Sequence, residues 1–132
     1  MEKPLAIVID GRKIYEYDRS TRLPGLQRRY LDELDERMMR EGVPFGDELI
    51  PNPNAMQRAQ YIANTLINAL FDNNEQLIAA TSAYLGTRVE DLKQVKAASS
   101  DRGMVIELVF DRYFEDAARE QPIHFTPLKK DA

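Results

Sequence analysis

The 132-residue chain contains no cysteine and no tryptophan, and its single histidine is His124. Without cysteine there is no disulfide framework, no thiolate to hold a metal ion and no cysteine nucleophile. One histidine cannot supply the several ligands that a histidine-based metal site within one chain requires. We therefore expect no metal site, and we predict that His124 is a structural residue in a short edge strand over residues 123–125.

Long hydrophobic runs are also missing. The apolar stretch in MEKPLAIVIDGRK spans about five residues, far fewer than the ~20 of a membrane span or the apolar core of a signal peptide. The chain has 18 lysines and arginines against 22 aspartates and glutamates, a net charge of −4, which weighs against nucleic acid as a partner. The sequence thus predicts a cytoplasmic protein without a membrane partner, folded as one domain over residues 1–126 with a frayed tail at 127–132.

The familiar signatures of phosphate-binding loops, zinc proteases, serine hydrolases and calcium loops do not occur in the sequence. We therefore expect no cofactor and no catalytic residue, and the sequence favours a protein that is not an enzyme. Acidic residues do crowd one segment, but arginines lie three or four positions away, which indicates ion pairs on a helix surface rather than a two-carboxylate site. The acids are Asp32, Glu33, Asp35 and Glu36, and the predicted pairs are Glu33 with Arg37 and Glu36 with Arg40.

Hydrophobic periodicity and turn residues give the element order β-β-α-α-α-β-β. The predicted elements are a hairpin around Asp10-Gly11, helices over 24–40, 55–71 and 75–85, and a second hairpin around 101–103. Because strands and helices do not alternate, a doubly wound parallel sheet is disfavoured. We predict an α+β fold in which the two hairpins join into an antiparallel sheet, with about three helices packed on one side.

The segments between these elements also carry specific expectations. Residues 43–54 should form a surface loop with a short extended piece at 48–50, and Asn54 should be the N-cap of the second helix. Gly86 should end the third helix, and Thr87 should cap a further helical turn.

Side-chain alternation predicts which residues face the core. Pairing about Asp10-Gly11 puts one apolar set on the core face of the first hairpin and a second set on an opposite face that should be partly covered. These sets are Leu5, Ile7, Ile9 and Ile14 on the core face, and Ala6, Val8, Tyr15 and Tyr17 on the opposite face. The first helix should pack by an apolar stripe made of Leu23, Leu26, Tyr30, Leu34 and Met38.

The first thirty residues are the one basic region of the chain, and tyrosines are interleaved with its arginines. Such a region suits an anionic or phosphorylated ligand, especially near the start of a helix. One functional hypothesis is therefore a small-molecule or anion-binding protein, with or without catalysis. Its ligand-binding residues would be Arg19, Arg22, Arg28 and Arg29 with Tyr15 and Tyr17.

Residues 54–86 contain only three charged residues, Arg58, Asp72 and Glu75. A helix that packs on a sheet by one face normally keeps a charged outer face. Either the helices over 55–85 are buried within the monomer, or part of their surface meets another chain, because loss of charge also marks the core of an interface. A domain of this size has few layers, which favours the second alternative.

Our leading interpretation is a non-catalytic protein-association module, an accessory or regulatory subunit. It would form a homodimer through these charge-poor helices and could bind another protein as well. The predicted contact residues are Gln57, Gln60, Tyr61, Asn64 and Asn68.

Overall fold

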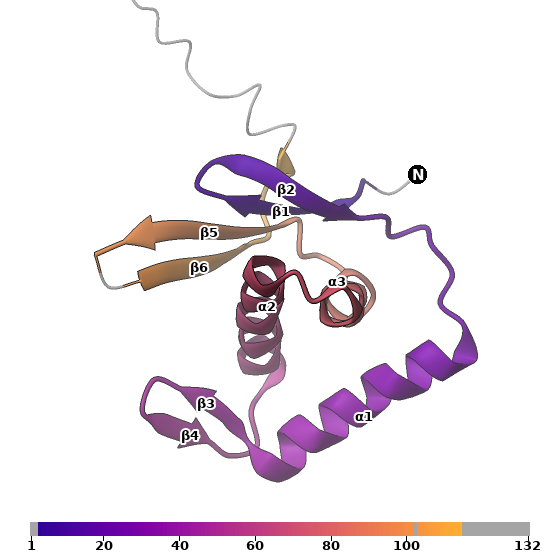
Figure 1. The fold of residues 1–132 in the computed structure, drawn as a ribbon. Helices are drawn as coiled ribbons and strands as arrows, with labels where there is room; N and C mark the ends of the chain where they lie inside the picture. The colour runs from indigo at the N-terminus through magenta and orange to yellow at the C-terminus, as the bar shows by residue number, and fades with distance from the viewer. Residues whose placement is uncertain (1–2, 102, 115–132) are drawn as a thin grey trace, which may run out of the picture.

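The computed structural model describes residues 3–101 and 103–114, so the predicted strand over 123–125, His124 and the tail at 127–132 lie outside the described residues. The predicted α+β class is confirmed: a four-stranded sheet carries helices on one side (Figure 1). α2 lies under β6 and α3 under β2, while α1 packs against α3. The elements are β1 (Leu5–Ile9), β2 (Arg12–Tyr17), α1 (Gly25–Glu41), β3 (Val43–Phe45), β4 (Glu48–Ile50), α2 (Ala55–Asp72), α3 (Glu75–Arg88), β5 (Gln94–Ser100) and β6 (Gly103–Val109).

The sheet is mixed rather than antiparallel, which corrects the predicted arrangement of the hairpins. Its strand order is β2-β1-β5-β6, and β1 and β5 run parallel. β2 returns the chain to the end of the sheet where β1 starts, and the segment from α1 to α3 leaves and re-enters the sheet at that same end, so β5 begins beside the start of β1 and runs parallel to it. Asp10 ties the two hairpins together: its N–H donates to the carbonyl of Ala97 at 2.8 Å, and its carboxylate accepts the N–H of Ser99 at 2.8 Å and its Oγ at 2.9 Å.

A β-bulge at Ile14 changes the predicted faces of the first hairpin. Asp10 and Gly11 form the expected turn, both with positive φ (49° and 84°). The register then shifts, so that Ile7 pairs with Tyr15 while Val8 pairs with Lys13. Ile14 is the extra residue of the bulge and is 52% exposed. The bulge moves Tyr15 and Tyr17 to the core face with Leu5 and Ile7, so the prediction was wrong for Ile14 and for both tyrosines.

The opposite face of β1 is covered, as the sequence predicted. Ala6 and Val8 are buried there. Two aromatic residues that follow β6 lie close to lysines that flank this face. The ammonium of Lys13 is 5.8 Å from the centre of the Phe114 ring, and the ammonium of Lys3 is 5.0 Å from the centre of the Tyr113 ring. β1 is therefore buried on both faces and forms the centre of the sheet together with β5.

The segment between α1 and α2 contains a second, two-stranded sheet. β3 and β4 pair antiparallel there, so the predicted loop over 43–54 was wrong except for its extended piece at 48–50. The predicted N-cap of α2 is confirmed, since Asn54 and Gln57 form a reciprocal capping box. None of the helices in the described part of the chain combines the length and the apolar character that crossing a membrane requires.

The predicted stripe of α1 packs only in part. Leu31 and Met38 are its buried residues, whereas Leu26 is 76% exposed. Tyr30 is also exposed, and Leu23 and Leu34 are partly buried against the core. The part of the predicted stripe that contains Leu26 and Tyr30 is therefore not packed into the core.

α3 continues through Gly86 to Arg88, so Gly86 does not end the helix. Thr87 lies inside the helix and donates its hydroxyl to the carbonyl of Ala83 at 2.7 Å, which corrects its predicted role as a cap. The ring of Tyr17 fills the space beside Gly86: a Cβ at that position would lie 2.2 Å from Cδ2 of Tyr17. A glycine at residue 86 allows the sheet and α3 to approach this closely.

We predict that Gly86→Ala destabilises the protein by about 1–3 kcal/mol, because the added methyl group displaces the Tyr17 ring. The matched control is Gly25→Ala at the start of α1, where an added Cβ meets nothing within 4 Å. This control should leave the free energy of unfolding in urea unchanged or slightly increased. Equal stability of the two variants would contradict the packing described for Tyr17.

Candidate functional site

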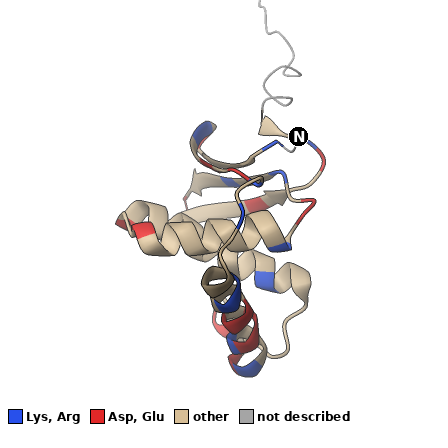
Figure 2. Cartoon of the chain, turned by 90° about the vertical axis from the view of Figure 1, so that its right-hand side faces the viewer, with Lys and Arg blue, Asp and Glu red and all other residues tan. Residues whose placement is uncertain are grey.

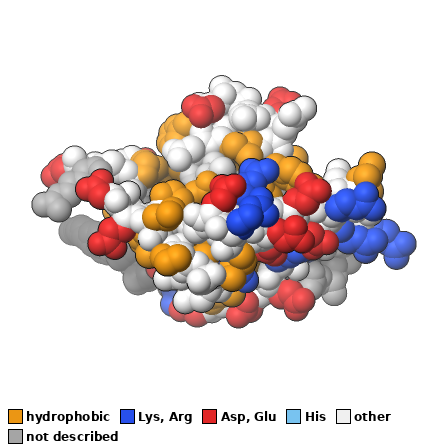
Figure 3. All heavy atoms as spheres, turned by 90° about the horizontal axis from the view of Figure 1, so that it is seen from below, with side chains coloured by type: hydrophobic (Ala, Val, Ile, Leu, Met, Phe, Trp, Pro, Cys, Tyr) orange, Lys and Arg blue, Asp and Glu red, His pale blue; other side chains and the backbone are white. Residues whose placement is uncertain are grey.

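The charges of the chain are unevenly distributed over its helices. Figure 2 shows Lys, Arg, Asp and Glu in bands along α1, whereas α2 and α3 are nearly free of them. Seen from below, charged side chains of both signs follow α1, and hydrophobic side chains gather toward the β3–β4 hairpin (Figure 3). The exposed apolar residues of that hairpin include Phe45 and Leu49. The two charge-poor helices, α2 and α3, differ in how far burial explains their lack of charge.

Burial within the monomer accounts for the missing charges in the second half of α3. Every residue from Thr81 to Gly86 is buried, because this half of the helix lies between α1, α2 and β2. The hydroxyls of Thr81 and Ser82 donate to the carbonyls of Leu77 and Ile78, each at 2.7 Å. A charged side chain here would lose its hydration without gaining a partner.

Burial does not account for the outer side of α2. Tyr61 and Asn64 are half-buried and Asn68 is exposed. Gln57 belongs to the capping box, and Gln60 donates its Nε2 to Asn64 Oδ1 at 3.1 Å and to the carbonyl of Ile106 at 3.2 Å. We refer to these five residues as the neutral side of α2. Water can reach this side, yet it carries no charge.

Three of the residues proposed to bind an anion, Tyr17, Arg19 and Tyr15, pack against the core or bond to α3. Tyr17 is buried in the core, and its hydroxyl has no hydrogen-bond partner within the described part of the chain. Arg19 donates to the carbonyls of Gly86 at 3.1 Å and Val89 at 3.0 Å, and so closes the C-terminus of α3. Tyr15 is half-buried and packs against the core.

The remaining arginines of that hypothesis lie nearer to solvent. Arg22, Arg28 and Arg29 are exposed, and Arg28 lines a cavity of about 290 Å³ together with Arg88 and Thr87. For these three arginines the anion-binding hypothesis stays a prediction.

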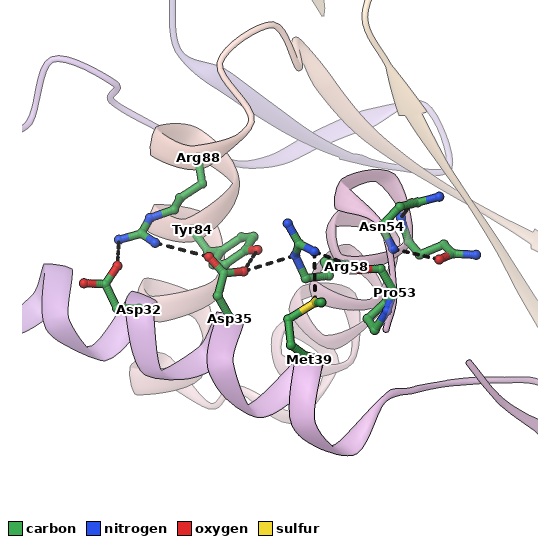
Figure 4. A network of polar contacts seen from close by, with 9 residues as sticks. Asp32, Asp35, Met39, Pro53, Asn54, Arg58, Tyr84 and Arg88 are labelled. Atoms are coloured by element: carbon green, nitrogen blue, oxygen red, sulfur yellow. Dashed lines mark hydrogen bonds and ion pairs between the residues drawn. The ribbon is translucent and has the colours of Figure 1, made fainter. Parts of the chain in front are cut away.

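A polar network joins α1 to the two other helices, with Asp35 at its centre (Figure 4). Asp35 accepts a hydrogen bond from the hydroxyl of Tyr84 and one at 3.2 Å from Nη1 of Arg88. Nε of Arg58 faces Oδ1 of Asp35 across 3.3 Å, an ion pair without hydrogen-bond geometry. Asp32 pairs with Nη2 of Arg88 at 2.8 Å. Two carboxylates therefore neutralise two guanidinium groups.

This network corrects the predicted ion pairs of α1. Glu33 and Arg37 form no ion pair with each other, nor do Glu36 and Arg40, although the structure describes all of α1. The acids that do pair reach across to α2 and α3. Sequence spacing reveals partners on one helix, whereas it gives no signal for a partner on another helix.

The network holds α1 against α2 and α3 through hydrogen bonds and ion pairs. Burial and the hydrogen bond to Asp35 raise the pKa of Tyr84 to about 12, so its hydroxyl remains a donor at neutral pH. Within the described residues, no group of three or more His, Asp or Glu side chains could hold a metal ion. The network is best understood as a clamp between helices.

A groove between α1 and α3 is the other feature of this region. Its volume is about 590 Å³, and none of its lining residues is charged. Leu26 and Tyr30 from α1 face Gln76, Ala79 and Ala80 from α3 across it. The groove is therefore a second neutral surface that could meet another chain.

Comparisons with protein-family models, with curated proteins and with solved structures found no match to this chain.

We predict opposite outcomes for two tyrosine-to-phenylalanine substitutions. Tyr84→Phe removes a hydrogen bond to a carboxylate and should lower the free energy of unfolding by about 1–3 kcal/mol. Tyr17→Phe removes a buried hydroxyl without a partner, so the melting temperature should stay the same or rise. A larger loss of stability for Tyr17→Phe than for Tyr84→Phe in urea denaturation would overturn this assignment.

We also predict that Asp35 contributes more to the free energy of unfolding than Asp32 does. Asp35→Asn removes the carboxylate that Arg58 and Arg88 share. This substitution should lower the free energy of unfolding by about 2–3 kcal/mol. Asp32 has a side chain that is 62% exposed, so Asp32→Asn should cost less than about 1 kcal/mol. Chemical denaturation of both variants checks this, and equal losses would show that Asp35 does not fix α1.

Proposed function

We propose that this protein is a non-catalytic association module that forms a homodimer through the neutral side of α2. The observation that carries the proposal is the contrast between the two charge-poor helices. The missing charges in the second half of α3 are explained by burial in the monomer, while those of the accessible side of α2 are not. A contact with another chain would explain them, because an interface core excludes charge.

Further features of α2 support the same proposal. Phe71 near its C-terminal end is 59% exposed, and Tyr61 lies on the neutral side itself. Aromatic residues are enriched in interface cores relative to the rest of a protein surface. Gln60 and Asn64 already hydrogen-bond to each other, so these polar groups can lose water without losing all their partners.

A second copy of the chain is the simplest partner for a neutral surface. In a two-fold dimer each residue of the patch meets the same patch on the other subunit, so a charge would often face its own copy. An uncharged patch avoids that repulsion. A partner of a different sequence would place no such restriction on the charges of α2.

The proposal predicts that Asn64→Glu with Asn68→Glu converts a dimer into a folded monomer. Asn64 and Asn68 lie one turn apart, and glutamates there would place like charges near the two-fold axis and bury carboxylates without partners, at a cost of at least a few kcal/mol. Glutamate is a better helix former than asparagine, so the fold of the monomer should persist. Light scattering at about 100 μM measures the mass, since dimer formation depends on concentration.

The control adds the same charges to the α1–α3 groove. Gln76 and Ala79 are exposed on α3 and line that groove, and Gln76→Glu with Ala79→Glu should leave the dimer intact. A wild-type protein that is monomeric at this concentration would refute the proposed dimer. A dimer that survives the asparagine substitutions and dissociates in the control would place the interface at the groove instead.

A further inference from the structure

The two edges of the four-stranded sheet differ in how well they are protected against pairing with another strand. β2 forms one edge, and it carries the bulge at Ile14 together with Arg12, Lys13 and Glu16. Bulges and charges are the usual devices that prevent an edge strand from pairing. β6 forms the other edge, with a regular register along its whole length and Glu107 as its one charged residue. The β6 edge therefore lacks the protection that the β2 edge has.

The backbone groups at the β6 edge can be assigned from the hydrogen bonds of β5. The carbonyl of Ala97 accepts a hydrogen bond from the N–H of Asp10, and the N–H of Ser99 donates to the Asp10 carboxylate. The backbone groups of Ala97 and Ser99 therefore point toward the first hairpin. The alternate residues of β5, Lys96 and Ala98, therefore face β6. Their register partners there are Glu107 and Val105.

The alternate residues of β6 therefore direct their backbone N–H and C=O groups away from β5, toward the outside of the sheet. These residues are Met104, Ile106 and Leu108. Within the described part of the chain, the hydrogen bond from Gln60 to the carbonyl of Ile106 is the one that reaches this edge. A carbonyl oxygen accepts two hydrogen bonds, so Ile106 keeps capacity for another. The edge thus presents an open row of donors and acceptors.

We propose that β6 pairs antiparallel with β6 of a second copy around a two-fold axis at Ile106, so that two four-stranded sheets become one continuous sheet. This inference rests on the proposed homodimer and adds its geometry. Ile106 is the midpoint of Gly103–Val109, so an axis there lets the whole strand pair. Met104, Ile106 and Leu108 would form the new backbone hydrogen bonds.

The side chains of β6 suit pairing with a copy of itself. With the axis at Ile106, Val105 of one copy lies opposite Glu107 of the other, and the two Glu107 carboxylates are not directly opposed. Val105 is 60% exposed, and pairing would cover it. On the other face, the partly buried side chains of Met104, Ile106 and Leu108 would continue the core of one copy into that of the other.

The β6 edge and the neutral side of α2 form one continuous surface. Gln60 bonds to Ile106 and also to Asn64, so a two-fold axis at Ile106 brings α2 of both copies close to it. Charged side chains on this part of α2 would repel their copies across the axis. Strand pairing thus gives a physical reason for the neutral residues of α2.

Cysteine cross-linking tests the pairing and its register, because the chain has no cysteine of its own. A mixture of Val105→Cys and Glu107→Cys proteins should form a disulfide-linked heterodimer under mild oxidation. Residues opposite each other in a non-hydrogen-bonded pair have Cα atoms about 4.5 Å apart, within the range of a disulfide. Both positions are exposed, so the substitutions should not disturb the fold. The control is Ile14→Cys, at the exposed bulge of the protected edge.

The expected result is rapid cross-linking of the 105/107 mixture, with Ile14→Cys and each single variant cross-linking at least tenfold more slowly. If the wild type is a dimer that the Asn64 and Asn68 substitutions dissociate, yet the mixture does not cross-link faster than the control, the β6 pairing is refuted while the neutral side of α2 stands. If the mixture cross-links and the asparagine substitutions leave the dimer intact, the pairing stands and the α2 contact is refuted. A monomeric wild type without cross-links refutes both.

Discussion

The contact between the ring of Tyr17 and the backbone of Gly86 determines how the layers of this protein fit together. The bulge at Ile14 turns Tyr17 toward the core, and the absence of a side chain at Gly86 lets α3 lie directly against that ring. Arg19, two residues after Tyr17, then closes the C-terminus of the same helix. The end of β2 thereby fixes both the position and the end of α3. Because α3 lies between the sheet and α1, the placement of α1 depends on this contact as well.

The position of α3 explains why one charge-poor sequence segment gives two different environments. Its second half is surrounded by other elements, so neutral residues there satisfy the ordinary requirement that buried groups be uncharged or paired. α2 packs against β6 and α3 and keeps one side accessible. On that side the lack of charge calls for another cause, and the proposed pairing at the neighbouring edge of β6 would provide one. A surface that combines unpaired backbone groups with neutral side chains is suited to pair with another chain.

Local features of the sequence predicted the elements well. Asp10-Gly11, the asparagine before α2 and the alternating apolar residues of β6 act over a few positions, and the structure places a turn, a cap and a core-facing strand at them. The errors arose where the cause is distant in sequence. Nothing in the alternation of β2 reveals which residue will be left over at a bulge. Gly86 is typical of a helix end, and its role becomes clear only once Tyr17 lies against it.

The same limit applies to the candidate site. Loss of charge could be recognised in the sequence, but whether burial or contact causes it depends on which helix is surrounded. The partners of Asp35 lie on α2 and α3, so the clamp could not be predicted from spacing along α1. The neutral residues of α2 were identified from sequence, whereas the adjoining edge of β6 required the strand order. Parallel pairing of β1 with β5 is what leaves β6 at the edge.

Backbone amide hydrogen exchange of the unmodified protein, followed residue by residue at low and high concentration, measures directly whether the edge of β6 pairs with a second copy. Exchange reports hydrogen bonding of each N–H group separately. We expect the amides of Met104, Ile106 and Leu108 to exchange more slowly as the concentration rises, because pairing of the two β6 strands protects them. The amides of Val105 and Glu107, already bonded to β5, should not change. Exchange at Met104, Ile106 and Leu108 that is equally fast at all concentrations would contradict this pairing.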